Sequence, residues 1–443
     1  MATSKVQRIF SQSRIWDPRI AGLVIFLVAL TLRVVMIYLQ KSYTLGIRSP
    51  GELENIAFSL AQGGGFANAY GPGTGPTAHG APLYPILLSL IFRLFGAGVS
   101  GKFVEQVLSA TLASVQYALL PLVAVACRFP SQVGIGAGLF AALVPLDFWI
   151  QTNGSWEYSL FALLAVLVSL AILKTWRDGD FSWRRGLAIG ILGGLNLLTT
   201  PQLLFTLVVA LAYPYATSAE VRKSGYRVFA VTQVAVIAIM LAPWVVRNYL
   251  VLGSPIWSRS NLGLELNLSN NDGVSPLWRE NHRADMFQKL NPSSNPIERQ
   301  RISALGEVAY NKEKLAVAKQ WMISHPGRLV TLTAQRIWYF WFPPMNTPGQ
   351  TIGLALATLL GFLGLGLALR RAGHAPRYFL LLWCVFPLPL YLFQQSTRLR
   401  YPIEWATFLM AAYALVCLGS KRLRVRSELG GHPANGQVSE LGI

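Results

Sequence analysis

The sequence predicts an all-α polytopic membrane protein with about ten transmembrane helices. It also predicts juxtamembrane helices on the outer face and a mostly helical extracytoplasmic loop domain. Three observations lead to this fold class. First, 53% of the 443 residues are hydrophobic, and the mean hydropathy is +0.43. Second, only 13% are charged, against roughly a quarter in soluble domains. Third, the apolar residues gather in runs near the length of about 20 residues that a helix needs to cross a bilayer.

Ten apolar runs are expected to cross the membrane. They cover residues 20–40, 104–127, 131–150, 159–175, 185–200, 202–216, 228–247, 350–369, 377–394 and 402–419. Two shorter runs, 82–96 and 329–342, are predicted to be juxtamembrane or re-entrant helices on the outer face. The alternative is a miscounted pair of compensating spans.

The distribution of positive charge sets the predicted orientation. The formal net charge is +19, but Lys and Arg lie in short segments between the apolar runs, as the positive-inside rule describes. We therefore interpret the charge as a topology signal and expect no nucleic-acid partner. With the N-terminus in the cytoplasm, every strong basic cluster falls on the cytoplasmic side. These clusters contain Arg128, Lys174, Arg177, Arg184, Arg185, Arg222, Lys223, Arg227, Arg370, Arg371, Arg377, Lys421, Arg422, Arg424 and Arg426.

Five regions follow from this orientation. The basic N-terminus has no cleavage site after it, so the first span is expected to be a retained anchor. The tail after Arg426 contains Gly, Ser and Asn and is expected to be disordered. The regions are a cytoplasmic N-terminus (1–19), an N-terminal membrane region (20–247) with an outer loop (41–103), an extracytoplasmic loop domain (248–349), C-terminal membrane helices (350–420) and a cytoplasmic tail (421–443).

The first outer loop holds the two carboxylates of greatest interest. Glu52 is expected to begin a short helix, because Ile56 and Leu60 follow at helical spacing and Gly63 ends the pattern. Acidic residues in a first turn favour the helix dipole, which is the structural interpretation of Glu52 and Glu54. The functional interpretation is a general base at the membrane surface. The Gly- and Pro-rich segment that follows predicts an irregular path.

Several stretches carry a family resemblance when they are taken in order along the chain. They are Gly51-Glu52-Leu53 through Gly63-x-Gly65-Phe66, Gly75-Pro76-Thr77-Ala78 through Ala81-Pro82-Leu83-Tyr84-Pro85, Pro243-Trp244-Val245-Val246-Arg247-Asn248-Tyr249, Ser260-Asn261-Leu262-Gly263-Leu264-Glu265, Gly306-Glu307-x-x-Tyr310 with His325-Pro326 and Arg336, and Arg400-Tyr401-Pro402-Ile403-Glu404. Together they resemble the bacterial glycosyltransferases with the C-type membrane fold. These are relatives of the dolichyl-phosphate-mannose protein mannosyltransferases and of the lipid A aminoarabinose transferases. The resemblance covers about residues 20 to 420.

The resemblance implies a multispan enzyme that takes a sugar from a polyprenyl-phosphate carrier without a cofactor. It further implies a site on the periplasmic or other extracytoplasmic face of the cell (inner) membrane, where a first-loop carboxylate activates the acceptor. Glu52 matches that carboxylate, and Glu54 stays as the alternative. Membrane lipids and an acceptor that is a protein, a lipid or a glycan are the other expected partners.

A phosphate leaving group needs positive charge where negative charge develops. Arg247, Arg398 and Arg400 lie at outer span ends and are candidates, although each could instead snorkel to the headgroups. Glu404 lies at the mouth of an apolar span, where an ionisable group is functional or paired by default; Arg400 is its candidate partner. The other predicted substrate-binding residues are His79, Tyr84, Asn248, Asn261, Glu265 and Tyr401. A lone His79 also suits a structural role.

Other classes of site and function find less support. Asn270-Asn271-Asp272 is a weak metal signal, and the three cysteines lie in separate apolar runs, so no metal site is predicted. No P-loop or Rossmann fingerprint appears, which disfavours a nucleotide-sugar donor. Trp156 fits an interfacial aromatic belt better than a sugar contact. The alternatives are a lipid-linked-sugar transporter or flippase, which the lack of repeated halves disfavours, an oligosaccharide polymerase or ligase, and a non-catalytic envelope assembly protein.

Overall fold

The computed structural model describes residues 17–46, 50–144, 148–223, 225–371 and 373–429. Within these ranges the regular structure is helical, with two isolated β-bridges, Ala67 to Pro76 and Leu277 to Gln395. The predicted all-α polytopic membrane fold is thereby confirmed. The membrane bundle holds α2 (Pro18–Gln40), α5 (Val99–Ala118), α6 (Leu120–Ala126), α7 (Ser131–Leu143), α8 (Phe148–Asn153), α9 (Tyr158–Asp178), α10 (Trp183–Leu197), α11 (Leu204–Thr217), α12 (Ala219–Lys223), α13 (Tyr226–Leu252), α20 (Pro348–Leu369), α21 (His374–Val385) and α22 (Thr397–Leu429).

The polar segments fold into helices of their own. They form α3 (Glu52–Ala61), α4 (Leu83–Phe95), α14 (Leu262–Ser269), α15 (Trp278–Arg283), α16 (Asp285–Leu290), α17 (Pro296–Leu305), α18 (Glu307–Ser324) and α19 (Pro326–Trp341). Three short 3-10 helices complete the described structure, namely η1 (Ser42–Leu45), η2 (Pro201–Leu203) and η3 (Pro389–Leu392).

Helices cover most of each predicted span, although the stretch 131–150 is divided between α7 and α8. By length and apolar composition, seven helical segments of the described chain can cross a membrane. They are Pro18–Gln40, Val99–Ala126, Tyr158–Asp178, Tyr226–Leu252, Pro348–Leu369, His374–Leu392 and Thr397–Gly419. The apolar helices Ser131–Leu143 and Pro201–Thr217 are shorter, and so is Leu83–Phe95 in the predicted juxtamembrane segment.

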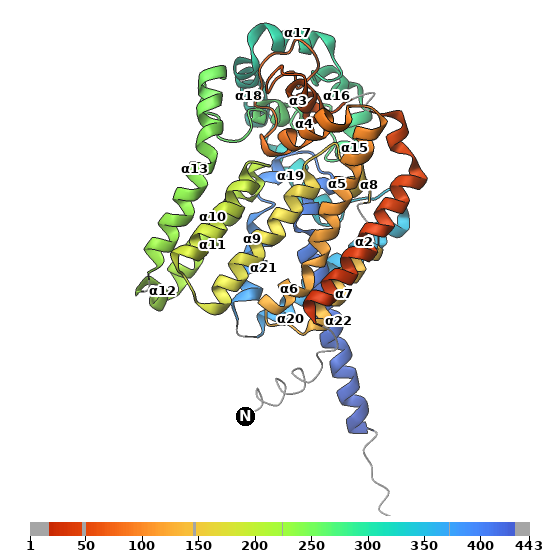
Figure 1. Ribbon diagram of the computed structural model, residues 1–443, viewed down its shortest axis with the longest axis vertical. Helices are drawn as coiled ribbons and strands as arrows, with labels where there is room; N and C mark the ends of the chain where they lie inside the picture. The colour runs from red at the N-terminus through yellow and green to blue at the C-terminus, as the bar shows by residue number, and fades with distance from the viewer. Residues whose placement is uncertain (1–16, 47–49, 145–147, 224, 372, 430–443) are drawn as a thin grey trace, which may run out of the picture.

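The two polar segments meet at one end of the molecule. In Figure 1, α3 and α4 lie beside α15 to α18 at the top, whereas α2 begins and α22 ends at the bottom. Arginines from separate loops come together at the other end: Arg128 Nη2 donates to the Arg177 carbonyl at 3.3 Å, and Arg371 lies over the Tyr413 ring at 5.5 Å. The molecule is therefore polarised along the bundle axis, with its loop helices at one end.

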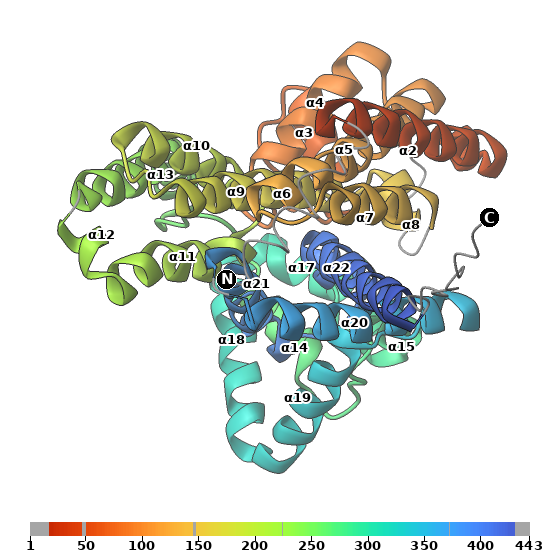
Figure 2. The same ribbon diagram turned by 90° about the horizontal axis from the view of Figure 1, so that it is seen from below.

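Glycines allow two helix pairs of the bundle to approach closely. Gly186, Gly190 and Gly194 recur every fourth residue on the face of α10 that packs along α13. A Cβ at Gly186 would stand 2.4 Å from the Phe229 carbonyl oxygen, and one at Gly364 of α20 would stand 1.9 Å from the Met410 carbonyl oxygen of α22. Small residues at this spacing are a standard way to bring membrane helices together. Figure 2 shows α10 to α13 grouped on one side of the bundle, while α18 and α19 project from another.

Two helices of the outer domain, α17 and α18, follow each other closely along the chain. Gly306 separates them with φ of 77°, a left-handed conformation that favours glycine. α18 ends at Ser324, with His325 as its C-cap. The short run 329–342 is α19, whose last carbonyl, at Trp341, accepts from Arg400 Nη1 of α22 at 2.6 Å.

A buried arginine closes a break in the membrane bundle. The predicted span 131–150 is interrupted, because α7 ends at Leu143 and α8 begins at Phe148. Arg33 of α2 is fully buried and donates to the Ala142 and Ala141 carbonyls at 3.2 Å each, and to Gln151 Oε1 at 2.7 Å. Carbonyls freed at a helix end inside a membrane require such partners. Arg33 therefore joins α2 to both α7 and α8.

Arg33→Met should destabilise the folded protein by about 3 kcal/mol, because hydrogen bonds to a charged group contribute about 1.5–3 kcal/mol each. The stability of Arg33→Lys should lie between those of wild type and Arg33→Met, since lysine keeps the charge but loses the planar fork of donors. Thermal unfolding in detergent measures the effect, with the exposed Arg19→Met on the same helix as control. Equal unfolding midpoints for wild type and Arg33→Met would remove this role.

Candidate functional site

Glu52 begins α3 at the outer end of the molecule. Gly51 is the N-cap, and its N–H donates to Glu54 Oε2 at 2.8 Å, so the third helical residue caps the first turn. Gly63, with φ of 84°, follows the other end of the helix. Glu52 is half-buried, and its Oε1 accepts a hydrogen bond from Ser293 Oγ of the outer domain at 2.8 Å. The helix start thus holds one carboxylate without a salt bridge to any described residue.

Glu54, the second predicted carboxylate, is fully engaged. Its Oε1 accepts from Lys102 Nζ of α5 at 2.8 Å and from Ser155 Oγ at 3.0 Å. Lys102 also contacts Glu105 Oε1 at 3.0 Å, and all three charged side chains are buried. This network fixes α3 to α5, so Glu54 supports the site structurally while Glu52 stays accessible.

The irregular part of the first loop is pinned from two sides. Arg247, near the outer end of α13, donates to the carbonyls of Phe66 and Thr77, each at 2.7 Å, and to Asn248 Oδ1 at 2.8 Å. Glu307, at the start of α18, accepts from the Ala78 N–H at 2.6 Å and from the Thr77 and Ser260 hydroxyls. Arg247 and Asn248, both predicted as substrate-binding, therefore hold the loop, and Glu307 joins it to the outer domain.

His79 lies in this pinned loop. Its Nδ1 lies 2.8 Å from the Tyr70 hydroxyl, and the two rings meet edge to face with centroids 5.1 Å apart. Burial raises the pKa of Tyr70 well above its usual value, and the nearby Glu307 and Glu52 raise it further. Tyr70 consequently stays a neutral phenol that can donate to Nδ1 and leave the ring N–H on Nε2.

Glu265 of α14 is a third carboxylate at this end of the molecule. A Cβ at Gly263 would stand 1.9 Å from the Asn311 carbonyl oxygen, so glycine lets α14 pack tightly against α18. Asn261 Nδ2 donates weakly to Glu265 Oε1 at 3.4 Å. Burial raises the pKa of Glu265; His79 and Arg398 lower it, and Glu52 raises it. His79, Arg398 and Glu52 therefore all lie within electrostatic range of Glu265.

Arg398, one residue inside the start of α22, lies beside two indoles that meet edge to face with ring centroids 6.3 Å apart. Its guanidinium carbon is 4.7 Å from the ring centroid of Trp156 and 4.8 Å from that of Trp278. It makes no hydrogen bond or ion pair to any residue that the structure describes, and its Nε is buried without a partner. His282 stacks on Trp278 with centroids 4.7 Å apart, and its pKa is lowered by burial and by Arg398 while Glu52 opposes the shift.

We call Glu52, His79, Glu265, His282 and Arg398 the Glu52–Arg398 cluster. Glu52 and Arg398 both act on the pKa of Glu265 and of His282, so both charges lie within electrostatic range of these two groups. The first loop, α14, α15 and α22 each contribute to the cluster. A carboxylate can accept a proton, and an arginine with unused N–H groups can bind an anion.

The remaining predicted residues lie apart from this cluster. Arg400 is buried, and its Nη2 donates to Thr358 Oγ1 at 2.8 Å. The Tyr401 hydroxyl donates to Gln116 Oε1 at 3.2 Å, and Glu404 is buried in the same helix. The Tyr84 hydroxyl donates to the Gly154 carbonyl. Of the three predicted arginines, Arg247 and Arg400 thus donate to protein oxygens, and Arg398 alone among those three does not.

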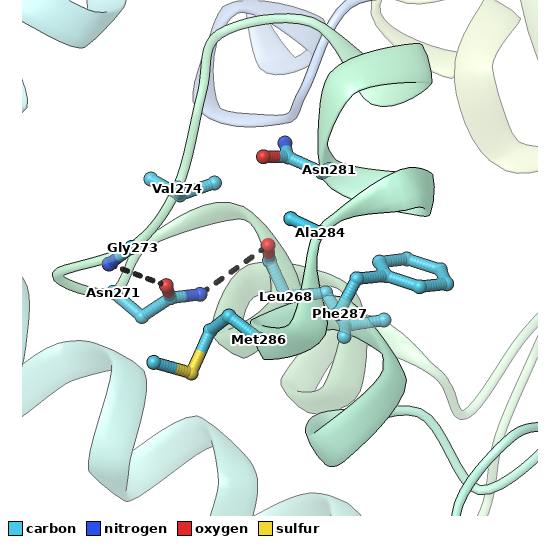
Figure 3. A pocket seen from close by; sticks show the side chains of 8 residues that line it. All are labelled: Leu268, Asn271, Gly273, Val274, Asn281, Ala284, Met286 and Phe287. Carbon is cyan, nitrogen blue, oxygen red and sulfur yellow. Dashed lines mark hydrogen bonds between the residues drawn. The ribbon is translucent and has the colours of Figure 1, made fainter.

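Figure 3 shows a small recess behind α15 and α16. Its empty volume is about 170 Å³, and the Asn271 amide in its wall bonds to the Gly273 N–H at 3.2 Å and the Leu268 carbonyl at 3.4 Å. Binding sites for small molecules usually occupy about 300–1,000 Å³. This recess is therefore too small for a sugar on a lipid carrier. The lining residues are Leu268, Asn271, Gly273, Val274, Asn281, Ala284, Met286 and Phe287.

Glu265→Gln should raise stability at neutral pH and leave it unchanged below the unfolded pKa of glutamate. The folded protein holds the Glu265 proton more tightly than the unfolded chain, so stability falls as pH rises from that unfolded pKa to the raised folded pKa. Each unit by which the folded pKa of Glu265 exceeds its unfolded pKa lowers the free energy of unfolding at neutral pH by about 1.4 kcal/mol. Denaturant unfolding at several pH values tests this, with Glu313→Gln, whose carboxylate forms an exposed ion pair, as control. A variant that is less stable than wild type at pH 7 would contradict it.

Sequence reasoning missed Tyr70, Ser293, Trp278 and His282. Ser293 contacts Glu52 across 241 residues, and Trp278 reaches Arg398 from the outer domain. No local pattern marks such residues, because their positions depend on tertiary packing. The aromatic-belt interpretation of Trp156 does not indicate its contact with Arg398, whose guanidinium carbon lies 4.7 Å from the ring centroid.

Comparison with known proteins shows a shared fold. No protein-family model matches the sequence, and a search of curated proteins finds no significant match. Solved structures of the oligosaccharyltransferase of Archaeoglobus fulgidus do match. One is AglB in complex with an inhibitory peptide and a dolichol-phosphate, with a TM-score of 0.53 and 14% identity over 94% of this chain and 52% of that chain. Another, in complex with Zn and sulfate, has a TM-score of 0.55 and 16% identity over 92% and 50%.

A third structure of that oligosaccharyltransferase is tethered with an acceptor peptide containing the NVT sequon. Its TM-score is 0.53, at 15% identity over 93% of this chain and 52% of that chain. The chain therefore spans about half the length of the structures it matches. The fold is that of the C-type membrane glycosyltransferases, as the sequence resemblance predicts.

Proposed function

We propose that this chain is a glycosyltransferase that moves a sugar from a polyprenyl-phosphate carrier to an acceptor on the extracytoplasmic face of the membrane. The observation that carries the proposal is the pairing, at one end of a C-type fold, of a half-buried carboxylate without a salt bridge and an arginine whose N–H groups are unused. Transfer from a lipid phosphate requires these two functions, a base for the acceptor and positive charge for the leaving group.

Glu52 is the base in this proposal. Of the two carboxylates in the first turn of α3, Glu54 is paired with Lys102 at 2.8 Å, so this carboxylate is already engaged in the fold. Glu52 accepts a single hydroxyl hydrogen bond at 2.8 Å, from Ser293, the kind of contact that an acceptor hydroxyl would make. Its position at the helix start directs it toward the outer domain.

Arg398 receives the phosphate in this proposal. Arginine suits phosphate because its planar fork of N–H donors matches two oxygens at once. The guanidinium groups of Arg247 and Arg400 donate to carbonyls and hydroxyls of the protein at donor–acceptor distances of 2.6–2.8 Å. The guanidinium of Arg398 donates to no residue that the structure describes. The oligosaccharyltransferase with this fold was solved with a dolichol-phosphate and with an acceptor peptide, which supports a lipid phosphate donor in general.

The chemistry is then a displacement at the sugar's anomeric carbon. The acceptor hydroxyl forms a bond to that carbon, its proton goes to Glu52, and the bond from the carbon to the phosphate oxygen breaks. Polyprenyl phosphate leaves with the electron pair and an added negative charge, which Arg398 stabilises. Glu265 and His79 lie beside this path and are proposed to contact the sugar or the acceptor, with Asn261 behind Glu265.

We propose that the site lies outside the cytoplasm. The short basic loops after α6, α9 and α20 lie at the end of the bundle opposite the Glu52–Arg398 cluster (Figure 1), and by the positive-inside rule this supports an extracytoplasmic site. The proposed location is the cell (inner) membrane, with 41–103 and 248–349 outside and with 1–19 and 421–443 in the cytoplasm.

Sidedness and activity are tested together in sealed vesicles of known orientation, loaded with a panel of radiolabelled polyprenyl-phosphate sugars and membrane acceptors. We expect release of polyprenyl phosphate only where the donor is on the proposed outer face. Movement of intact donor across the bilayer without release would instead indicate the flippase. Release from the cytoplasmic face alone would overturn the assigned orientation.

A further inference from the structure

The Glu52 carboxylate accepts one hydrogen bond from the described part of the chain, and its donor is a serine of the outer domain. Ser293 Oγ, between α16 and α17, donates to Glu52 Oε1 at 2.8 Å across 241 residues of sequence. Glu52 Oε2 accepts none from a residue that the structure describes. We propose that Ser293 is a positioning residue that fixes the direction of the Glu52 carboxylate and leaves Oε2 to take the acceptor's proton. This role rests on the proposed function.

Glu52 needs such a contact because its other surroundings leave the carboxylate free to turn. It begins α3, is half-buried and forms no salt bridge in the described structure. Glu54 is by contrast held at both oxygens, by the Gly51 N–H at Oε2 and by Lys102 Nζ at Oε1, each at 2.8 Å. A glutamate side chain has several free rotations, so an unheld carboxylate points in many directions. Because a general base acts only within hydrogen-bond reach of its proton, a base that is held in one direction acts more often.

A neutral donor suits this role better than a cation. A lysine in the place of Ser293 would hold the carboxylate firmly, but its positive charge would oppose the transfer of a proton to Glu52. A serine hydroxyl donates one hydrogen bond and carries no net charge. Ser293 can therefore orient Glu52 and still leave its negative charge available to the acceptor's proton.

The backbone of Ser293 is held on both sides. Its N–H donates to Asn291 Oδ1 at 2.8 Å, and its carbonyl accepts from Arg299 Nη2 at 2.7 Å. Arg299 Nε also donates to the Pro292 carbonyl at 3.1 Å, so α17 anchors this segment. We call residues 291–295 the Ser293 loop. Because the loop is bonded at each of these points, the hydroxyl reaches the proposed base from a defined backbone position.

The neighbouring Ser294 provides a matched control. Both serines are exposed and lie in the Ser293 loop. The Ser294 N–H donates to the Asn291 carbonyl at 3.0 Å, but the Ser294 hydroxyl makes no hydrogen bond to a residue that the structure describes. Replacing either serine with alanine removes one hydroxyl from the same stretch of backbone, so the contact with Glu52 is what distinguishes the two variants.

The experiment measures release of polyprenyl phosphate from a panel of radiolabelled polyprenyl-phosphate sugars by the full-length protein in membranes. The variants are Ser293→Ala, Ser293→Thr, Ser294→Ala, Arg299→Met, and Ser293→Ala combined with Arg299→Met. Each rate is scaled to the folded protein in the preparation. The kcat and the KM for the donor are determined separately, because a positioned base changes the first and not the second.

We expect Ser293→Ala to lower kcat about 3- to 30-fold, the size of one partly exposed hydrogen bond to a charged group, and to leave the donor KM unchanged. Ser293→Thr keeps the hydroxyl and should recover most of the rate, and Ser294→Ala should match wild type. Arg299→Met should also lower kcat. In the double variant it should add nothing to the loss from Ser293→Ala, because the arginine acts on the base through the serine.

Three results would overturn the positioning role and leave the proposed function in place. One is wild-type kcat in Ser293→Ala while Glu52→Gln stays inactive. A second is a higher kcat in Ser293→Ala, because the hydroxyl would then compete with the acceptor. The third is an equal loss in Ser293→Thr, which would show that the hydroxyl is not responsible. Release by wild-type protein from no donor in the panel would instead remove the proposed function, and the positioning role with it.

Discussion

Glu52→Gln should lower the rate of sugar transfer by about 10²- to 10⁴-fold, the usual contribution of a positioned general base. The amide keeps the size of the side chain and can still contact Ser293, which lies 2.8 Å from Glu52, but it cannot take the acceptor's proton. The variant should fold normally, because Glu52 forms no salt bridge in the described structure. The measurement is kcat for transfer at saturating donor, scaled to the folded protein in each preparation.

Two controls separate this loss from a general effect of removing an acid. Glu313→Gln removes an outer-domain carboxylate paired with Arg301 at 2.7 Å on the surface and should keep full activity. Glu54→Gln should lower the unfolding temperature, because it breaks the buried contact with Lys102 at 2.8 Å. Full transfer activity in both Glu52→Gln and Glu54→Gln would end the assignment of the base to this helix.

Arg398→Ala should lower kcat/KM for the donor by about 10²- to 10³-fold, as expected when a donor to a developing negative charge is removed. Arg398→Lys should recover part of this loss, since an ammonium restores the charge but not the two-pronged geometry of the guanidinium. Both constants should change, because the phosphate is bound in the ground state and gains charge in the transition state.

Arg247→Lys provides the contrast for that prediction. Arg247 holds the Phe66 and Thr77 carbonyls of the first loop at 2.7 Å each, so its loss should act through loop order and lower the unfolding temperature together with activity. Arg398→Ala should leave the unfolding temperature near that of wild type. A large stability loss in Arg398→Ala, with transfer per folded molecule unchanged, would show that Arg398 is structural.

The start of the site helix was predictable because its signals are local. The helical spacing of Ile56 and Leu60 after Glu52, and Gly63 after the helix, mark α3 in the sequence, and the structure confirms this helix. The fold class follows equally from hydropathy, since long apolar segments have few stable states other than spanning helices. The prediction for 131–150 as one span was wrong because hydropathy hides breaks; the carbonyls at Ala141 and Ala142 are satisfied by Arg33 from another helix.

The choice among arginines was not predictable. Arg247, Arg398 and Arg400 all lie at span ends, so the sequence gives them the same environment. Their neighbours distinguish them: Arg247 and Arg400 contact carbonyls, whereas Arg398 contacts indoles. The carbonyl partners are 59 to 181 residues away along the chain. The distinction between Glu52 and Glu54 likewise depends on Lys102, which is 48 residues from Glu54.

Glu52 is proposed as the base for transfer from a polyprenyl-phosphate sugar. The measurement that tests this role is transfer of label from a panel of such donors by membranes containing equal amounts of folded wild-type protein, Glu52→Gln or Glu313→Gln. We expect transfer from at least one donor by wild type and Glu313→Gln, and a loss of about 100-fold or more in Glu52→Gln. Transfer by Glu52→Gln at the wild-type rate would show that Glu52 is not the base.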